Sequence, residues 1–442
     1  MCGTLITRDS DRRDSIIHRG TESRSEYNRE YGAFLVHHRL PIQTVEGDGW
    51  GQPIRIGDSY LLYNGEIFNY PDKYESDVEY LKDLFSSEGI SGALREANKW
   101  DGFWAIVYLN SDGDAYCFTD PLGKKQLYYN NKGEICSEIK PLLNQGDTFD
   151  EIYKSSVRKW GYNTGDRTPF SNIKRMVPNR LYSFNKRKLV SIGTKDYYDW
   201  TLDVPYKDSL KWLMIQAVKR RLLSKTYKIG ALVSGGLDSA IIAKILNDLN
   251  AEVQLYSIEN NESEYAAILG EFLGKDIKYM QYAIEDDAEA IFKSNETPID
   301  LGSVIPQHKL MQAIPETIIL TGDGADELFG GYKRTKVYDS QKSDVFEELP
   351  YYHLPRLDRA SMRFTKELRS PFLSHDVVKF ALNLPYRMRQ DKNYLREVYA
   401  KDLPEEILKR DKLPLKNFNL LRDTQQYTEW VHDIYYNKIN WI

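Results

Sequence analysis

The chain has 442 residues, more than one ordinary hydrophobic core requires, so its length predicts two or three domains. Its 41% hydrophobic and 28% charged residues are typical of a globular protein, and a formal net charge of −5 argues against a dedicated nucleic-acid binder. Its three cysteines form no CxxC pair, and its apolar runs fall short of the roughly 20 residues that span a bilayer, so we expect a cytoplasmic protein without a membrane segment.

The first stretch, MCGTLITRD, places a cysteine directly after the initiator methionine. Taken alone, Cys2 is a weak signal, because a cysteine at this position is most often incidental. The alternative is a nucleophile whose own α-amino group, with a reference pKa of about 8, serves as the base once Met1 is removed. Other parts of the chain have to decide between the two.

Residues 1–195 consist mostly of predicted β-strands separated by Gly, Asn and Asp turns. Runs such as YGAFLVHHRLPI, DSYLLYNGEIFNY and FWAIVYL have the composition of strands. One helix is predicted at SDVEYLKDLFSSEG, where apolar residues recur at helical spacing behind a Ser76–Glu79 capping box. We therefore expect a first domain of the α+β class, with antiparallel sheets in two layers.

After a predicted linker, KDYYDWTLDVP at about 195–205, the pattern changes. From KDSLKWLMIQAVKRRLL onward, helices alternate with short buried strands such as those in KIGALVSGG and TIILTGDG. This alternation predicts a parallel sheet covered on both faces. The stretch from about 335 to the end is mainly helical. We therefore expect a second domain, residues 205–442, of the α/β class with a helical C-terminal part.

LVSGGLDSA, at a predicted strand-to-helix junction, is the sharpest motif in the chain. Its small residues let backbone N–H groups approach an anion, and the helix that follows adds its positive dipole, which together favour phosphate binding. Asp238 is placed to hold Mg²⁺ on that phosphate. The plain alternative, a glycine turn before a helix, is disfavoured because six residues fit the pattern at the right junction.

A second loop, TGDGADELFGGY, also follows a buried strand. It carries Asp323, Asp326 and Glu327 within five residues. Carboxylates so close repel one another unless a cation lies near, so metal or substrate chemistry is favoured over an acidic surface loop.

SGGLDS is the signature of the PP-loop ATP pyrophosphatases. Together with LDRASMRFTKELRSPFL and DKLPLK, it makes the second half resemble the synthetase domain of glutamine-dependent asparagine synthetases. The resemblance implies attack on the α-phosphate of ATP, with release of AMP and pyrophosphate. It implies an ATP site at Leu232, Ser234, Gly235, Gly236, Asp238, Ser239, Ser257, Ile258 and Gly322, with Asp238 and Asp326 as Mg²⁺ ligands.

The same resemblance assigns roles to residues beyond the two loops. Lys412 matches the family's lysine that neutralises charge on the α-phosphate, and Asp323, where many members have glutamate, would lie near the attacking ammonia. Asp300, Ser303 and Glu327 would contact the carboxylate substrate. For Asp300 a simpler role remains open, as the cap of the helix that follows.

In the first half, HRGTES, HHRLPI, LYNGEIFNY and ESDVEYL follow one another and resemble the class II glutamine amidotransferase domain, an N-terminal-nucleophile hydrolase. By this resemblance Cys2 attacks the glutamine amide, while the Asn64 side chain and the Gly65 N–H form the oxyanion hole. Glutamine would be bound by Arg39, Asn64, Glu66 and Asp77, with Arg39 on its carboxylate and Asp77 on its ammonium group. Asp77 is also the expected first-turn acid of its helix, and both roles can hold. His18 is interpreted as structural.

The chain departs from the family pattern in a few places. Cys2 and His18 lie only sixteen positions apart, which indicates a lost helix, and HRGTES and PFLSH replace the commoner HRGPDS and PFLDH. Because of these changes, two questions stay open: whether the protein forms the homodimer that the resemblance allows, and which carboxylates it accepts as substrates.

The sequence thus predicts glutamine-hydrolysing, ATP-dependent amidation of a carboxylate through an acyl-adenylate. The expected substrates are glutamine, ATP and aspartate, with asparagine as the product and an apolar passage for ammonia between the domains. Two alternatives remain: the same fold acting on another carboxylate, and a catalytically silent scaffold. The second is disfavoured because the residues required for both half-reactions are present.

Overall fold

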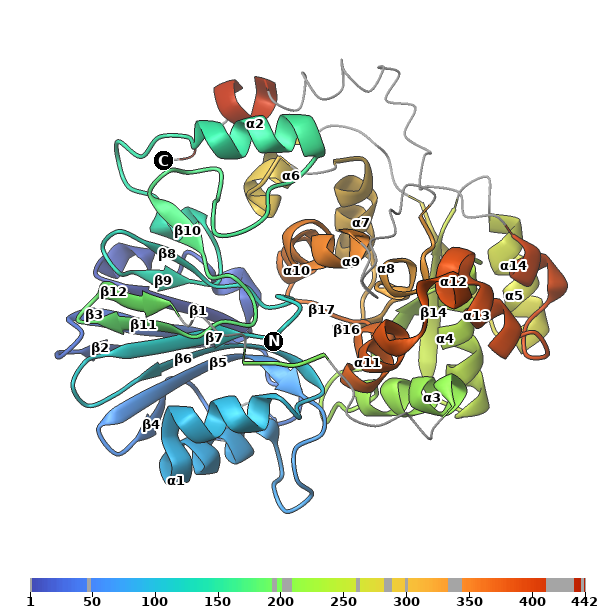
Figure 1. The fold of residues 1–442 in the computed structure, drawn as a ribbon, viewed down its shortest axis with the longest axis horizontal. Helices are drawn as coiled ribbons and strands as arrows, with labels where there is room; N and C mark the ends of the chain where they lie inside the picture. The colour runs from blue at the N-terminus through green and yellow to red at the C-terminus, as the bar shows by residue number, and fades with distance from the viewer. Residues whose placement is uncertain are drawn as a thin grey trace.

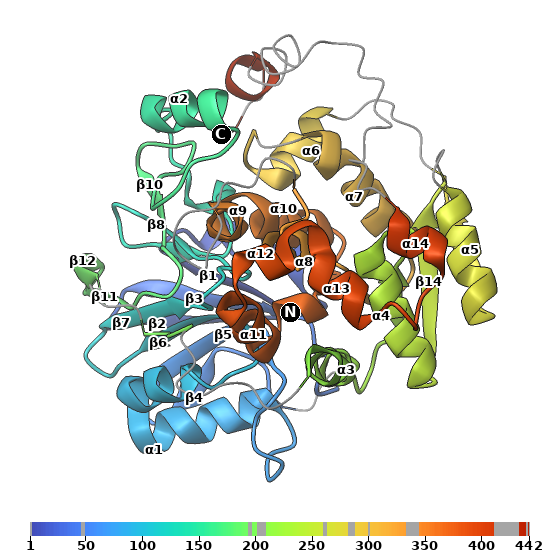
Figure 2. The ribbon, with the colours of Figure 1, turned by 45° about the vertical axis from the view of Figure 1, so that its right-hand side comes forward.

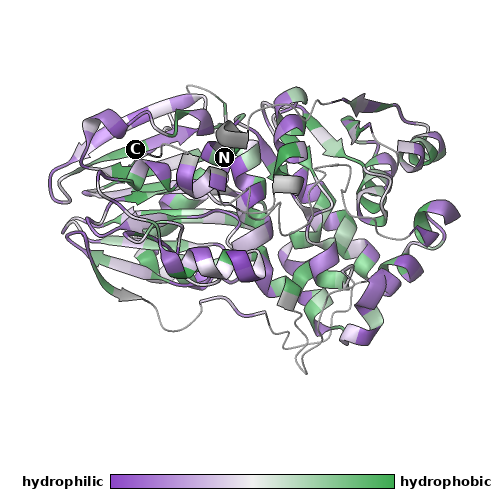
Figure 3. Cartoon of the chain, turned by 90° about the horizontal axis from the view of Figure 1, so that it is seen from above, coloured by the Kyte–Doolittle hydropathy of each residue, from purple (hydrophilic) through white to green (hydrophobic). Residues whose placement is uncertain are grey.

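The computed structural model describes residues 2–45, 49–192, 197–200, 209–259, 263–281, 288–298, 301–332, 344–410, 433–438 and 441. These residues form two parts that lie side by side (Figures 1 and 3), and the N-terminus lies where the parts meet. The predicted linker at about 195–205 falls largely outside the described residues.

The first part is a sandwich of two six-stranded antiparallel sheets. Its strands are β1 (Cys2–Thr7), β2 (Glu22–Asn28), β3 (Ala33–Arg39), β4 (Ile54–Ile56), β5 (Ser59–Ile67), β6 (Gly102–Leu109), β7 (Ala115–Thr119), β8 (Tyr128–Asn130), β9 (Ile135–Cys136), β10 (Ile173–Arg175), β11 (Tyr182–Asn185) and β12 (Lys188–Ile192). The sheet orders are β10-β8-β9-β1-β3-β2 and β12-β11-β7-β6-β5-β4. Leu35 of one sheet and Leu62 of the other share a buried core, so alternate strand residues fill the space between the layers.

The helix α1 (Asp77–Ala97) covers the outer face of the second sheet, where its Leu81 and Phe85 join a core with Trp104 of β6. The predicted N-terminal cap forms in part. Ser76 Oγ accepts a hydrogen bond from the Glu79 N–H at 3.2 Å, whereas the Glu79 carboxylate accepts from the N–H of Glu75, one residue before the cap. The first part also contains α2 (Glu151–Trp160).

The second part contains a parallel five-stranded sheet flanked by helices. Its strands are β13 (Ile229–Leu232), β14 (Val253–Ile258), β15 (Ile277–Met280), β16 (Ile318–Leu320) and β17 (Glu367–Arg369). Its helices are α3 (Leu210–Arg221), α4 (Leu237–Asp248), α5 (Ser263–Leu273), α6 (Ala288–Asn295), α7 (Leu301–Ala313), α8 (Ala325–Phe329), α9 (Asp344–Glu348), α10 (Leu354–Met362), α11 (His375–Asn383), α12 (Tyr386–Arg389), α13 (Asn393–Val398) and α14 (Glu405–Lys409). The sheet order is β15-β14-β13-β16-β17, so the strand order reverses direction at β13. In open parallel sheets, such a reversal is where ligands bind, at the carboxyl ends of the strands.

The two parts share one hydrophobic core. Leu40, Ile42, Phe68, Phe103 and Leu122 of the first part belong to the same buried cluster as the strands and helices of the second. The C-terminal π-helical turn η7 (Ile434–Lys438) adds a further contact, because the Tyr436 ring lies 4.8 Å from that of Phe149 in the first part. Both predicted fold classes are confirmed. The two parts are held together by apolar side chains that they bury against each other, and not only by the chain that connects them.

Candidate functional site

The first candidate site lies where the two sheets of the sandwich approach each other. Cys2 begins β1, opposite Arg39 of β3, and is buried. Its backbone N–H donates to Asn64 Oδ1 at 2.9 Å. Asn64 lies on β5 of the other sheet, so this bond fixes the beginning of β1 against that sheet. This bond leaves Asn64 Nδ2 buried without an acceptor among the described residues. A buried, unsatisfied donor beside a thiol is the group that a developing oxyanion would accept from.

A small pocket that is partly open to solvent adjoins this pair of residues. It is lined by Cys2, Arg39, Leu40, Pro41, Ile42, Gln43, Thr44, Gln52, Tyr63, Gly65, Glu66, Asp77 and Val78. Arg39 is held by the Glu22 carboxylate at 2.8 Å and by the Thr44 hydroxyl. The pocket therefore offers a guanidinium and a carboxylate, the charges that complement the two ends of an amino acid.

Asp77 is the first residue of α1, as predicted, and its carboxylate is buried in the pocket wall. It accepts hydrogen bonds from Tyr63 Oη at 2.8 Å and from the Ile67 N–H at 3.0 Å. Burial raises the pKa of Asp77 to about 6, against the lowering effect of these two donors. Asp77 is therefore charged at neutral pH and loses its charge in mild acid.

Glu66, also predicted, accepts from Gln43 Nε2 at 2.6 Å, a partner that the motifs did not indicate. Burial, and then the nearby charge of Glu367 on β17, raises the pKa of Glu66 well above its ordinary value. The charge of Glu367 in the second part therefore acts on Glu66 in the wall of this pocket. Gly65 packs so tightly against β6 that a Cβ would lie 2.1 Å from the Phe103 carbonyl oxygen.

The second candidate site occupies the carboxyl ends of β13, β14 and β16. The chain leaves β13 through Ser234–Gly236 and enters α4, and the Ser234 N–H donates to Ser239 Oγ at 3.1 Å. Gly235 has φ +68°, and a Cβ there would lie 2.5 Å from the backbone of Tyr265. The loop thus requires glycine for both conformation and space. Leu232 and the Ser257–Ile258 pair end the neighbouring strands β13 and β14.

The two acidic loops predicted to act together lie in contact. Gly322 packs on Asp238, where an added Cβ would lie 3.0 Å from Asp238 Cβ. Asp238 of α4 and Asp326 of α8 meet at the ammonium group of Lys392, at 2.5 Å and 2.6 Å. Lys392 lies between α12 and α13, which adjoin α8 (Figure 2). Lys392 was not among the predicted site residues.

Lys392 is a permanent cation in this setting. Burial alone would lower its pKa, but the carboxylates of Asp238 and Asp326 outweigh burial and raise it. The side chain reaches the two acids because Asp391 and Lys392 have left-handed backbone angles, φ +54° and +59°. No periodicity in QDKNYLR reveals such a turn, so the sequence carried no signal for this role.

The remaining acidic residues divide between two surroundings. Glu327 is buried and accepts from Tyr332 Oη at 2.9 Å, with His353 Nδ1 at 3.5 Å. Asp323 is half-buried in the turn between β16 and α8, and Ser303 is half-buried in α7. The predicted residues Asp300 and Lys412 lie outside the described residues. Arg410, not predicted, donates to the Ser234 carbonyl oxygen at 2.9 Å.

The donor set near Lys392 suits Mg²⁺. Two carboxylates supply hard oxygen ligands, and Mg²⁺ in phosphate-transfer sites commonly takes one or two carboxylates together with substrate phosphates. Within the described ranges, no group of three or more His, Cys, Asp and Glu side chains forms an all-protein metal cage. Asp238 and Asp326 therefore fit a metal ion that arrives with a nucleotide.

A two-sheet sandwich followed by a parallel-sheet part places the chain among two-part amidotransferases, in which a glutaminase precedes an ATP-dependent synthetase. The family model described as glutamine amidotransferase domain matches residues 6–198, and the one described as asparagine synthase matches 209–350 and 334–438. The chain belongs to the asparagine synthase family. It is a ligase of the glutamine-hydrolysing asparagine synthase type, and its domains imply glutamine and ATP as substrates.

Individual relatives agree with this assignment. A protein of Acanthamoeba polyphaga mimivirus named as a probable glutamine-hydrolyzing asparagine synthetase is 27% identical over 95% of this chain and 84% of its own length. The glutamine-hydrolyzing asparagine synthetase of Gallus gallus is 26% identical over 82% of this chain and 73% of its own. That of Homo sapiens is 25% identical over 90% of this chain and 79% of its own. None of the helices in the described parts is long and apolar enough to cross a membrane.

Proposed function

We propose that the chain hydrolyses glutamine at Cys2 and uses the ammonia to convert aspartate to asparagine, with ATP cleaved to AMP and pyrophosphate. The observation that carries this proposal is the Cys2–Asn64 contact beside a pocket that is lined by Cys2, Arg39 and Asp77. A thiol, a buried unsatisfied amide donor and two opposite charges are what glutamine hydrolysis requires.

In the first half-reaction, the Cys2 thiolate attacks the amide carbon of glutamine. The oxyanion accepts from Asn64 Nδ2, the C–N bond breaks as the departing nitrogen takes up the proton lost by the thiol, and ammonia leaves. Water then hydrolyses the thioester that remains on Cys2 and gives glutamate. Arg39 binds the α-carboxylate and Asp77 the α-ammonium group, while Glu66 and Gln43 form the adjoining wall. Removal of Met1 would turn the Cys2 nitrogen into the α-amine that accepts the thiol proton.

In the second half-reaction, a carboxylate oxygen of aspartate attacks the α-phosphorus of ATP and pyrophosphate leaves. Ammonia then attacks the acyl carbon of the adenylate. The bond between this carbon and the bridging oxygen breaks, AMP leaves with that oxygen, and the amide remains. Ser234–Ser239 would bind the phosphates, with Leu232, Ser257 and Ile258 beside the adenine. Lys392 supplies positive charge to the leaving pyrophosphate in addition to the role proposed for Lys412.

Asp238 and Asp326 would hold Mg²⁺, which supplies Lewis-acid neutralisation of phosphate charge when bound. Asp300, Ser303 and Glu327 are the proposed aspartate contacts, and Asp323 the carboxylate nearest the attacking ammonia.

An apolar passage for ammonia between the sites remains part of the proposal. Support comes from the shared core, in which Leu40, Ile42 and Phe68 of the pocket side pack with residues of the second part. An apolar route favours neutral ammonia over ammonium, because burying an unpaired charge is costly.

The test is a carboxylate screen on the purified chain, measuring glutamate, AMP and pyrophosphate with glutamine and, separately, with ammonium. We expect AMP formation to require aspartate, and Cys2→Ala to abolish use of glutamine while ammonium still supports the reaction. AMP formation with a different carboxylate alone would overturn the substrate assignment. Absence of both glutamate and AMP under every condition would indicate a silent scaffold.

A further inference from the structure

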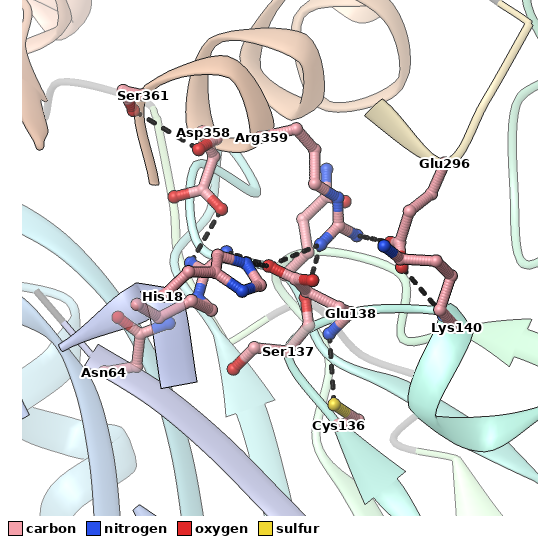
Figure 4. Close-up of polar contacts among 12 residues, drawn as sticks. His18, Asn64, Cys136, Ser137, Glu138, Lys140, Glu296, Asp358, Arg359 and Ser361 are labelled. Atoms are coloured by element: carbon pink, nitrogen blue, oxygen red, sulfur yellow. Dashed lines mark hydrogen bonds and ion pairs between the residues drawn. The ribbon is translucent and has the colours of Figure 1, made fainter. Parts of the chain in front are cut away.

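A cluster of buried charges lies at the interface between the two parts, where Glu138, Asp358 and Arg359 point toward one another (Figure 4). We call it the interface ion network; it consists of Arg19, Lys125 and Glu138 from the first part and Glu296, Asp358 and Arg359 from the second. Each of these side chains is at most 4% exposed. The network holds three cations and three anions, so its charges balance without solvent.

Arg19 connects this network to the nucleophile. Its Nε donates to the carbonyl oxygen of Cys2 at 3.1 Å. Its two remaining nitrogens donate to Glu138 at 2.9 Å and to Asp358 at 2.8 Å. The planar guanidinium fixes these three directions relative to one another, so the position of the Cys2 backbone depends on where the two carboxylates hold Arg19.

Of the two carboxylates that bond to Arg19, Asp358 is the one that belongs to the second part, where it lies on α10. Its other carboxylate oxygen accepts from Lys125 Nζ, so one side chain holds two cations of the first part. Burial alone would raise the pKa of Asp358, but Arg19 and Lys125 hold it below its ordinary value, so the carboxylate is charged. Its neighbour Arg359 anchors α10 by bonding to the Ser137 carbonyl oxygen at 3.0 Å.

We propose that Asp358 is a positioning residue for glutamine hydrolysis, acting through Arg19 on the Cys2 backbone. The inference rests on the proposed function, in which Cys2 is the nucleophile. It means that the glutaminase site is completed by a helix of the synthetase part. The helix α10 packs against α7 and is followed by β17. It therefore links the residues that hold Cys2 to the part that is proposed to bind the carboxylate substrate.

The test is Asp358→Asn in the full chain, which keeps the shape and removes the charge. We expect kcat for glutamine hydrolysis to fall by at least about tenfold, because small displacements of a reacting group are costly. KM for glutamine should stay within about twofold, since Arg39 and Asp77 are untouched. AMP formation with ammonium should be retained.

Asp101→Asn is the matched control. Asp101 is also a fully buried carboxylate at the interface, accepting from Arg221 at 3.0 Å and from the His375 N–H at 3.1 Å, but the contacts of its side chain do not include Arg19 or Cys2. Equal loss of glutaminase kcat in both variants would show that general loosening of the interface is responsible and would overturn the proposal.

A second variant separates positioning from stability. Asp358→Asn together with Lys125→Met removes one anion and one cation, so the balance of buried charge is restored while Arg19 still lacks its carboxylate. We expect this double variant to regain thermal stability but not glutaminase kcat. Recovery of both would contradict the proposal, as would an unchanged kcat in either Asp358 variant. A wild-type chain that releases no glutamate would instead contradict the proposed function itself.

Discussion

The two polar atoms of the Asn64 side chain differ in their surroundings in the proposed glutaminase pocket. Its side-chain oxygen accepts from the backbone of Cys2, and that bond directs its amide nitrogen into a buried position where no described group accepts from it. An unsatisfied buried donor costs free energy in the resting protein. The cost is recovered when an oxyanion forms beside it, which favours the transition state over the free site.

Asn64→Ala should therefore lower kcat for glutamine hydrolysis by about 10² to 10³, the usual effect of losing one oxyanion donor. KM for glutamine should change less than kcat, because Arg39 and Asp77 still bind the two charged groups of the substrate in the proposed mode, and steady-state release of glutamate measures both constants. Ammonium-dependent AMP formation is the internal control and should be unaffected. A variant with wild-type kcat would remove Asn64 from the mechanism.

Asp77 predicts a pH dependence of glutamine binding. Its pKa of about 6 is raised by burial, so the carboxylate is charged above that pH and takes up a proton below it. In the proposed binding mode, loss of the charge removes the partner of the α-ammonium group of glutamine. KM for glutamine should rise by about tenfold between roughly pH 7 and pH 5, the cost of losing a charge-assisted hydrogen bond. In Asp77→Asn, KM should be high and independent of pH over the same range; a pH-dependent KM in that variant would assign the titration elsewhere.

At the scale of elements, the loop between β13 and α4 depends on a glycine that has no substitute. Gly235 combines φ +68° with a Cβ position 2.5 Å from backbone atoms of α5. Gly235→Ala should displace the loop and lower AMP formation with either nitrogen source, while glutamine hydrolysis continues. Gly274→Ala is the matched control, since its φ is +61° but nothing lies within 4 Å of its Cβ. Equal effects in the two variants would mean that conformational strain, not space, decides the role of Gly235.

Elements were predictable where the signal is local. Ser76 caps α1 as its spacing indicated, and the strand-to-helix junctions after β13 and β16 carry their acidic residues where the motifs placed them. Asp238 and Asp326 were paired in advance by the family resemblance, and the structure brings them together because β13 and β16 are neighbours in a parallel sheet and end at the same edge.

Other parts of the sites could not be predicted because they depend on contacts distant in sequence. Lys392 reaches Asp238 across 154 positions, and Arg19 reaches Asp358 across 339. Neither lysine nor arginine has a periodic pattern that marks it, and the turn at Lys392 is fixed by tertiary packing. The family resemblance pointed to Lys412, which lies outside the described residues, whereas Lys392, a cation between Asp238 and Asp326, was found only in the structure.

At the scale of the molecule, the two parts are not independent units. They share a hydrophobic core, the interface ion network and the Asp101–Arg221 pair. The wall of the proposed glutamine pocket also contacts the second part, because the Ile42 carbonyl oxygen accepts from the Lys225 N–H at 2.9 Å.

A large apolar interface predicts coupled unfolding. Differential scanning calorimetry should show one cooperative transition for the whole chain. Tryptophan fluorescence and far-UV circular dichroism should report the same midpoint. Two separated transitions would show that the parts unfold independently and that the shared core contributes little to stability.

The central claim, that nitrogen released at Cys2 becomes the amide made at the ATP site, can be tested with glutamine labelled in its amide nitrogen. The purified chain would receive labelled glutamine, ATP and aspartate, and mass spectrometry would follow the products. We expect labelled asparagine to form in step with glutamate and AMP. Glutamate release without label in asparagine would contradict the account.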